Sequence, residues 1–428
     1  MNPIVKPFRG IFYDKNMVEW QDVLAPAYHS LTPAQWDLYR KKDEKNISHL
    51  ITGSESGWYA KSATLWERWK SQRDVDMDAK PAFYVLHQSM KTNGKTLVRK
   101  GCIGLLRLPT EGENHNSTLF DVNVQQRDDR MRLLEATKTH FDQITCFYNS
   151  PSAALDSLLT LSVHAEPFLE YVLDGVKTQL WRVTNQTMID HALHFFSQEK
   201  FFIAEGSHRL AAAIHLRDSM REQARAQGVE SSDSPADYIP AFFCSVSEPA
   251  SMIFPIHRVI DVEKEISREE IIAQLHKNFT LNQYSREQGL QKFRMAGKHA
   301  FLFALPGTPT CTLARLKNEE LLPGLFEQTE SELKQSLDLT ILHDHILKEV
   351  LKISSEDQRY SDRITYVSDE SEVFSCIQKR NAIGILHNAP SLPQLIEASA
   401  QSVSLPFQSF QFLPQLPSGM VMYSLDSP

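Results

Sequence analysis

The sequence predicts an α/β protein in which strands and helices alternate along the chain. Short apolar runs rich in aromatic and β-branched residues recur, and this is the pattern of buried strands. Between these runs, apolar residues recur at helical spacing. The two patterns alternate without a break over residues 179–246. Such alternation favours βαβ crossovers and a sheet with at least partly parallel pairing.

The length of the chain indicates more than one folded region. A chain of 428 residues exceeds what one hydrophobic core usually organises. The hydrophobic content of 42% and the charged content of 23% are ordinary for a globular protein. We therefore expect a core over residues 1–262 and a smaller C-terminal α/β region over residues 263–428. The boundary is placed where an apolar strand gives way to Glu263-Lys264-Glu265.

The first elements are predicted from apolar runs and from the residues that begin helices and turns. Ile4–Tyr13 is expected to be a strand. A helix begins at residues 31–36, because Thr32 can cap it and a proline occupies its first turn. A second helix is expected over residues 58–69. Strands at 81–88 and 100–108 then flank a polar turn centred on Asn93-Gly94.

The remaining elements follow from the same two periodicities. Acidic residues at the start favour a helix over residues 128–141. Further strands are expected at 143–148, 180–183, 201–204, 241–246, 300–305, 312–316, 364–367 and 382–386. Further helices are expected at 187–196, 210–226, 267–279, 339–351, 370–380 and 393–400.

Charge and composition argue against several classes of protein. The net charge of -8 disfavours general binding to nucleic acid or to anionic membranes, which needs a basic surface. No segment approaches the roughly 20 apolar residues of a membrane span, and the start does not resemble a signal peptide. The five cysteines are scattered and never form Cys-x-x-Cys. A soluble protein of the reducing cytoplasm is therefore expected.

The junction between the strand at 201–204 and the helix that follows it is the candidate site. The strand ends at Glu205-Gly206, and Ser207 occupies the position of a helix N-cap. Free backbone N–H groups and the positive end of a helix would stabilise an anion there. Arg209 could add a fork of donors, and His208 a donor or a proton carrier. The sequence predicts a phosphate-binding corner, although a capping or ion-pair role for these two side chains stays open.

Other nucleotide or metal motifs are not supported by the sequence. Gly297-Lys298 lacks the earlier glycine and the following hydroxyl residue of a P-loop, and no Gly-x-Gly-x-x-Gly occurs. His343-Asp344-His345 and Asp190-His191 with His194 lie in predicted amphipathic helices without a third partner at a known spacing. We therefore expect no metal site built by the protein alone.

The central motif resembles that of a known family. Glu205-Gly206-Ser207-His208-Arg209 is similar to the Asp-Gly-His-His-Arg signature of the domain of unknown function 1015 family. Five further stretches resemble motifs of that family in the same order along the chain: 24–28, 129–137, 180–183, 255–260 and 416–421. The family is itself described as ParB-like and related to the ParB/sulfiredoxin superfamily of nucleotide-binding proteins.

The resemblance implies a ParB-like mixed-sheet core and a phosphorylated ligand. The expected ligand is a nucleotide (ATP, ADP or CTP) with Mg²⁺, or a phosphorylated small molecule. A free-serine kinase is also similar to this superfamily, so phosphoryl transfer has a precedent on the fold. The implied activity is that of a small-molecule kinase or a nucleotide hydrolase.

The motif also suggests what each residue would do in such an enzyme. Gly206, Ser207 and their backbone N–H groups would cradle phosphate, and Arg209 would neutralise it. His208 would orient the phosphate. Glu205 or Asp121 would handle a proton or Mg²⁺.

Departures from the family pattern keep a second function open. A His-Glu pair usually precedes the Asp-Arg helix in the family, but residues 119–124 contain neither residue type. Glu205 replaces an aspartate, and Ser207 replaces the first histidine of the motif. Ser207 also replaces the reactive cysteine of sulfiredoxins, so sulfinic acid reduction is not expected. The alternative is a non-catalytic protein that senses a nucleotide or metabolite.

Two further basic positions are candidate ligand contacts. Arg130 begins the Asp-Arg helix, and His257-Arg258 lies on a strand that could neighbour the turn of Arg209. Arginines that converge on phosphate are how phosphoryl sites stabilise charge. Alternatives stay open for both: a helix cap or surface pair for Arg130, and an ion pair between the two regions for Arg258.

Overall fold

The computed structural model divides the chain into two compact units. Unit 1 comprises residues 1–118, 122–252 and 413–428, and unit 2 comprises residues 119–121 and 253–412. The sequence prediction places the boundary at residue 262 and assigns the closing residues to the second region. The structure describes residues 3–27, 33–53, 55–92, 95–110, 113, 116–120, 122–149, 155, 159–160, 163, 165–228, 233–248, 252–261, 267–326, 331–360, 363–379, 381–406 and 409–426. Thr32, Asn93-Gly94 and Asp121 lie outside these residues.

Unit 1 is built on a nine-stranded mixed sheet. Its strands lie in the order β6-β11-β8-β12-β5-β4-β10-β9, and β1 also pairs with β5. The bounds are β1 Val5–Lys6, β4 Phe83–Thr92, β5 Lys95–Arg107, β6 Asn116–Thr118, β8 Ile144–Tyr148, β9 Leu169–Leu173, β10 Val176–Val183, β11 Phe201–Glu205 and β12 Tyr238–Ser245. Two smaller pairs join β2 Ile11–Tyr13 to β3 Val75–Met77 and β7 Thr139–His140 to β21 Tyr423–Ser424.

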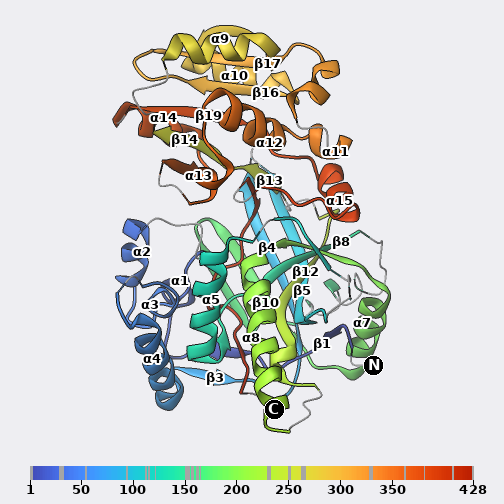
Figure 1. Cartoon of the computed structure of the whole chain (residues 1–428). Coiled ribbons are helices and arrows are strands. Elements are labelled where there is room, and N and C mark those ends of the chain that lie inside the picture. Colours follow the sequence, from blue (N-terminus) through green and yellow to red (C-terminus); the bar gives the residue numbers. More distant parts are fainter. Residues whose placement is uncertain are drawn as a thin grey trace. The chain divides into compact units, whose positions relative to one another are not determined.

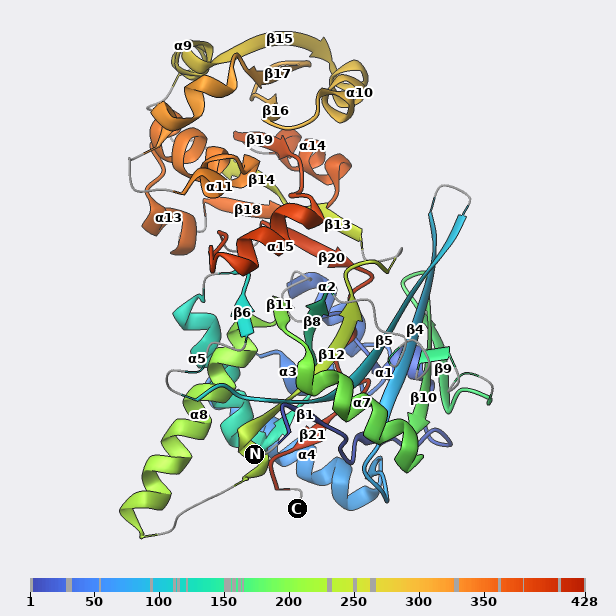
Figure 2. The same ribbon diagram turned by 90° about the vertical axis from the view of Figure 1, so that its right-hand side faces the viewer.

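Helices surround this sheet. They are α1 Trp20–Val23, α2 Pro33–Arg40, α3 Ser48–Ile51, α4 Trp58–Gln72, α5 Val124–Thr137, α7 Gln186–Gln198, α8 Ser207–Ala226 and the short 3₁₀ helix η3 Pro235–Asp237. α5 and α8 lie side by side (Figures 1 and 2). On α7, Phe196 packs against Phe83 and Phe243 of the sheet. Burial of such aromatic side chains is a main source of stability for the unit.

The predicted α/β class is confirmed, but the crossovers join strands that are not neighbours. α7 connects β10 to β11, and α8 connects β11 to β12. In the sheet, β8 lies between β11 and β12. The parallel pairs among the described strands are β6 with β11 and β8 with β12. The other strand pairs of this sheet are antiparallel, including the long β4–β5 hairpin.

The last residues of the chain complete unit 1. We refer to residues 413–425 as the closing segment. Its main chain accepts hydrogen bonds from Arg99 at Pro414 and from Gln143 at Val421. Its Ser418 N–H donates to the carbonyl oxygen of Ala25 across 2.8 Å. The closing segment therefore satisfies buried polar groups of a unit whose other residues lie far away in the sequence.

Unit 2 contains an antiparallel sheet with helices. Its strands lie in the order β15-β17-β16-β19-β14-β18. They are β14 His257–Asp261, β15 Phe279–Ser285, β16 Ala300–Ala304, β17 Thr310–Leu316, β18 Ile364–Val367 and β19 Ala382–His387, with a separate pair β13 Met252–Pro255 and β20 Phe410–Leu413. Its helices are α9 Arg268–Asn278, α10 Arg286–Ala296, η4 Glu319–Leu325, α11 Glu332–Gln335, α12 Asp338–Thr340, the π-helix η5 Ile341–Val350, α13 Ser355–Tyr360, α14 Glu370–Lys379 and α15 Leu392–Ala400.

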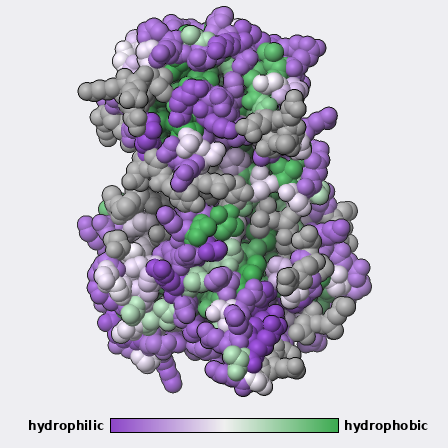
Figure 3. Space-filling model, viewed as in Figure 1, coloured by the Kyte–Doolittle hydropathy of each residue, from purple (hydrophilic) through white to green (hydrophobic). Residues whose placement is uncertain are grey.

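The surface is mainly polar on the face drawn in Figure 3, where apolar side chains are exposed in small patches. Within the described part of the chain, no helix is both long enough and apolar enough to cross a membrane.

Candidate functional site

The predicted junction of strand, glycine turn and helix is present, but the N-cap is Gly206 and not Ser207, which is the first residue of the helix. β11 ends at Glu205, Gly206 adopts a left-handed conformation with φ of +96°, and α8 begins at Ser207. A Cβ atom at Gly206 would lie 2.6 Å from Cγ2 of Ile144. Both the dihedral angle and the close approach therefore require glycine at this position. The carbonyl oxygen of Gly206 accepts the first intrahelical bond, from the N–H of Leu210 across 2.9 Å.

Arg209 extends from the first turn of α8 to the start of β8. Its Nη1 atom donates a 2.7 Å hydrogen bond to the carbonyl oxygen of Gln143. The same atom lies 3.9 Å from Oδ1 of Asp142, and that carboxylate also accepts a hydrogen bond from Ser418 of the closing segment. The Arg209 side chain is 19% exposed. Its charge is therefore partly balanced and partly open to solvent.

A small hollow brings Arg209 together with Arg130. Its lining includes both arginines, His140 and Asp142, and its volume is about 30 Å³. That is the space of about one water molecule, so a phosphate must bind at the mouth or displace side chains. The Arg130 side chain, 10% exposed, pairs with Asp129 and donates to the carbonyl oxygen of Ile51 at 3.3 Å. The pair predicted as one alternative for Arg130 is thus present, together with a place in this hollow. The helix-cap alternative is wrong, because Asn123 caps α5 and Arg130 lies in the middle of that helix.

His208 is neutral in this environment. Burial, followed by the positive charges of Arg209 and Arg130, lowers its pKa to about 4. His140 is affected in the same way: burial and then Arg209 lower its pKa to about 3. At neutral pH the two imidazoles can donate or accept hydrogen bonds, but they add no positive charge to the corner.

Glu205 is linked to a buried arginine that sequence reasoning missed. Its Oε2 atom accepts a 3.3 Å hydrogen bond from the Thr145 hydroxyl, and its charge favours the charged form of Arg99. Arg99 is 1% exposed, and burial is the main cause that lowers its pKa. Its Nη2 atom donates to Oε1 of Gln88 across 2.5 Å, whereas Nε and Nη1 have no partner. The one signal in the sequence is spacing: Arg99, Gly101 and Ile103 are two residues apart, so they lie on the same face of a strand.

The structure places His257 and Arg258 in a different sheet. Both are buried on β14, which pairs with β18 and β19. β14 therefore belongs to the sheet of unit 2 and pairs with no described strand of the sheet that leads to Arg209. The expected proximity of His257 and Arg258 to the turn of Arg209 stays a prediction. Nη2 of Arg258 lies 3.0 Å from Nε2 of His343, and within the described residues Arg258 makes no ion pair.

No metal centre is formed by the described residues, because none of their His, Cys, Asp and Glu side chains gather in a group of three or more. His343 instead contacts Arg258 and Gln358, and His345 lies 3.2 Å from the amide nitrogen of Asn278.

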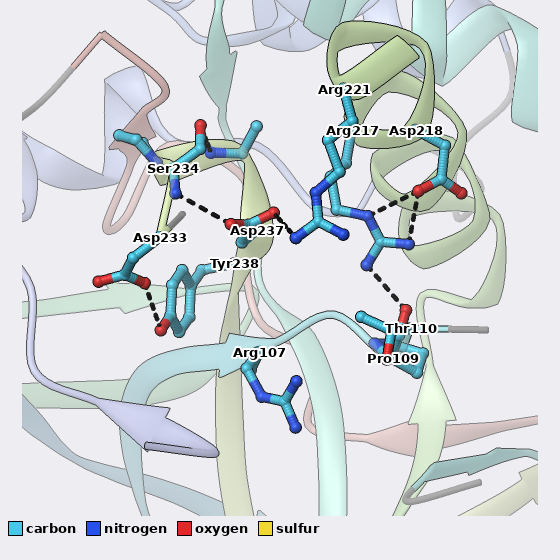
Figure 4. A network of polar contacts seen from close by, with 12 residues as sticks. Arg107, Pro109, Thr110, Arg217, Asp218, Arg221, Asp233, Ser234, Asp237 and Tyr238 are labelled. Atoms are coloured by element: carbon cyan, nitrogen blue, oxygen red, sulfur yellow. Dashed lines mark hydrogen bonds and ion pairs between the residues drawn. The ribbon is translucent and has the colours of Figure 1, made fainter. Parts of the chain in front are cut away.

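α8 is fixed along its length, which gives its first turn a defined position. Figure 4 shows the network that joins its middle to η3 and to Pro109, which follows β5. Arg221 pairs with the buried Asp237 at 2.7 Å, and Arg217 donates to the carbonyl oxygen of Pro109 at 2.7 Å. Asp237 also accepts from the N–H of Ser234, completing a capping box.

Solved structures with a similar arrangement have very different sequences. They include a conserved hypothetical protein from Pyrococcus furiosus, with 9% identity and a TM-score of 0.38 over 75% of this chain and 95% of that chain. A free serine kinase in complex with AMP has 8% identity and a TM-score of 0.38 over 72% and 86% of the two chains. SbnI with a C-terminal truncation from Staphylococcus aureus has 9% identity and a TM-score of 0.38 over 76% and 90%. A likeness at this level carries no argument about function.

None of the curated proteins matches this sequence. A family model does match, over residues 5–340, and its description is "Protein of unknown function (DUF1015)". That span covers most of the chain, including the glycine turn and both arginines of the hollow. The chain therefore belongs to the DUF1015 family.

Proposed function

We propose that this chain binds a nucleotide or another phosphorylated small molecule, with a phosphate at the corner where α8 begins. The observation that carries the proposal is that Arg130 of α5 and Arg209 of α8 line the same hollow. Guanidinium groups donate two parallel hydrogen bonds to phosphate oxygens, and two arginines from different helices can hold one phosphate from two sides.

The start of α8 adds to the attraction for an anion. The N–H groups of its first turn carry the positive end of the helix dipole. Asp129 and Asp142 balance the two arginines in part. A bound phosphate would compete with these carboxylates for the same donors. Binding should therefore weaken with increasing salt.

Two activities are consistent with this proposal. In a ParB-like small-molecule kinase or nucleotide hydrolase, Glu205 would accept a proton or hold Mg²⁺ beside the phosphate. In a non-catalytic sensor, the phosphate would bind without turnover. The position of Glu205 favours the sensor, because Thr145 donates to its carboxylate and its charge already interacts with the buried Arg99.

Calorimetry and a phosphate-release assay on the full chain test the proposal. Inorganic phosphate, pyrophosphate, ADP, ATP and CTP are titrated with and without Mg²⁺ into the wild type and into Arg209→Ala and Arg130→Ala. Arg225→Ala is the matched control, because Arg225 is an exposed arginine in the last turn of the same helix. Each site variant should lose at least about tenfold in affinity, as expected for a charge-assisted pair.

The outcomes separate the alternatives. Binding with phosphate release indicates an enzyme, and binding without release indicates a sensor. If none of these anions binds the wild type, or if Arg209→Ala binds as tightly as Arg225→Ala, the proposed phosphate corner is wrong.

A further inference from the structure

A second cavity lies in unit 1, between the sheet and the closing segment. Its volume is about 240 Å³. One wall is formed by β4, β9 and β10, and the opposite wall by residues 413–417 together with Pro26. None of its lining residues lines the hollow of Arg130 and Arg209. This space fits the body of a small organic molecule but not a whole nucleotide.

The inner part of this cavity combines apolar walls with two buried polar side chains. Met90, Tyr171 and Leu173 supply apolar surface from the sheet. Gln88 and Thr178 lie opposite each other on neighbouring strands, and both are buried. An apolar pocket with a few fixed polar groups is the usual form of a small-molecule site.

The hydrogen bonds of Gln88 connect the cavity to the closing segment and to Arg99. Its Nε2 atom donates to the carbonyl oxygen of Gln415 across 3.2 Å, and its Oε1 atom accepts from Arg99. These bonds fix the amide and hold the opposite wall of the cavity in place. The inner end is therefore preformed, with the positive charge of Arg99 behind it.

Asp174 is the charged side chain among the described residues that line the cavity. It lies in the turn between β9 and β10 and is exposed. Its Oδ2 atom accepts a 2.8 Å hydrogen bond from the Tyr39 hydroxyl, and this bond orients the carboxylate. Burial and Asp174 itself raise the pKa of Tyr39, so this phenol remains a donor. Asp174 keeps a second oxygen that can accept a hydrogen bond from a ligand.

We propose that this cavity binds a small primary amine with an apolar body. The ammonium group pairs with Asp174, and the body packs between the strand face and the closing segment. Charge complementarity determines the class of ligand, because the described lining residues offer a carboxylate and no cation. An anionic ligand would meet repulsion at Asp174, and a neutral one would leave that carboxylate without a new partner. This inference is independent of the proposed phosphate corner.

Calorimetry with 2-phenylethylamine and its neutral isostere 2-phenylethanol tests this inference on the full chain. We expect the amine to bind at least about fivefold more tightly than the alcohol, because one partly exposed ion pair typically contributes about that factor to affinity. Asp174→Asn should remove this preference and leave the fold intact, because asparagine tolerates the positive φ of 49° at this turn.

Steric variants test the location of the site. Val176→Phe should reduce amine binding because Val176 lines the cavity, whereas Val172→Phe is the matched control because Val172 is exposed on β9 and does not line it. Arg209→Ala should leave amine binding unchanged. If neither ligand binds at millimolar concentration, if amine and alcohol bind alike, or if Asp174→Asn retains the preference, the inference is wrong.

Discussion

The Nε2 atom of His208 accepts a 2.9 Å hydrogen bond from the main-chain N–H of Asn123. Asn123 is the N-cap of α5, where its own side chain accepts from Gln126. The bond therefore joins the start of α5 to the first turn of α8, the two helices that carry Arg130 and Arg209. It also fixes the tautomer, because an accepting Nε2 leaves the ring proton on Nδ1.

Acidification should weaken this connection. The pKa of His208 is about 4 in the folded chain, against an ordinary value near 6.5 when unfolded. The unfolded chain then binds more protons between these values, so the contribution of His208 is complete above about pH 6.5 and is lost as the pH falls towards 4.

The pH dependence of the unfolding free energy measures this effect. His208→Gln removes the titrating group and should flatten the dependence between pH 6.5 and 4. His191→Gln is the control, because His191 is exposed on α7. Equal slopes in the wild type and His208→Gln would show that protonation of His208 does not oppose folding.

Gly206→Ala should destabilise unit 1 more than Gly228→Ala does. Both glycines have positive φ, +96° and +74°. Alanine is strained in this conformation, so both variants should lose about 1 kcal/mol of stability. At Gly206 the new Cβ atom also meets Ile144, whereas at Gly228 no described residue lies within 4 Å of it. We expect a further loss of about 1–3 kcal/mol for Gly206→Ala. Chemical denaturation measures the free energy of unfolding of both variants. The difference between their losses is the cost of the clash with Ile144, and equal losses would contradict the prediction.

Asp237→Asn should loosen the middle of α8. The carboxylate accepts from Arg221 at 2.7 Å and from the N–H of Ser234 at 2.9 Å. Loss of charge-assisted bonds at a buried site costs about 2 kcal/mol. Glu55→Gln is the control, because its pair with Lys61 is exposed to solvent and should contribute little to stability. Thermal or urea unfolding measures both, and a loss for Asp237→Asn no larger than that for Glu55→Gln would argue against the network in Figure 4.

The histidines around Arg258 should make unit 2 sensitive to acid. Burial lowers the pKa of His257 to about 3 and that of His387 to about 4, and it keeps the pKa of His343 well below its usual value. All three must be neutral in the fold, so their contribution to stability is present above about pH 6.5 and declines below it.

Hydrogen exchange tests this sensitivity in β14 and β19, which carry His257 and His387. After correction for the intrinsic rate, protection of these strands should fall between pH 7 and 5. His343→Gln should reduce the fall, because glutamine has no group that titrates there. Unchanged protection of the wild type over this range would contradict the prediction.

The local parts of the site could be predicted because their signals lie within a few residues. An apolar run, Glu205-Gly206 and the alanine-rich start of α8 specify a strand, a turn and a helix through short-range sterics and hydrogen bonds. β15 was not predicted because it is an edge strand whose side chains are mostly exposed, so it lacks an apolar run. Ile4–Tyr13 was predicted as one strand, but it is two, separated where the N–H of Gly10 donates to the hydroxyl of Tyr84.

The long-range parts could not be predicted because nothing in the local sequence encodes the partner. Arg99 would be expected at a surface by residue type, but it is buried and donates to the carbonyl oxygen of Pro414, over 300 residues later in the chain. The pairing of β14 with β18 and β19 could not be predicted either. Several apolar strands of both units have a similar composition, so each could have been its partner. Periodicity identifies such strands but does not assign their neighbours.

The return of the closing segment to unit 1 has a consequence for biosynthesis. The ribosome must synthesise residues 413–425 before Gln143, Arg99 and Ala25 can meet their partners there. All the residues of unit 2 have been joined to the growing chain by then. A stop codon directly after unit 2 would therefore damage the part of the protein that was translated first.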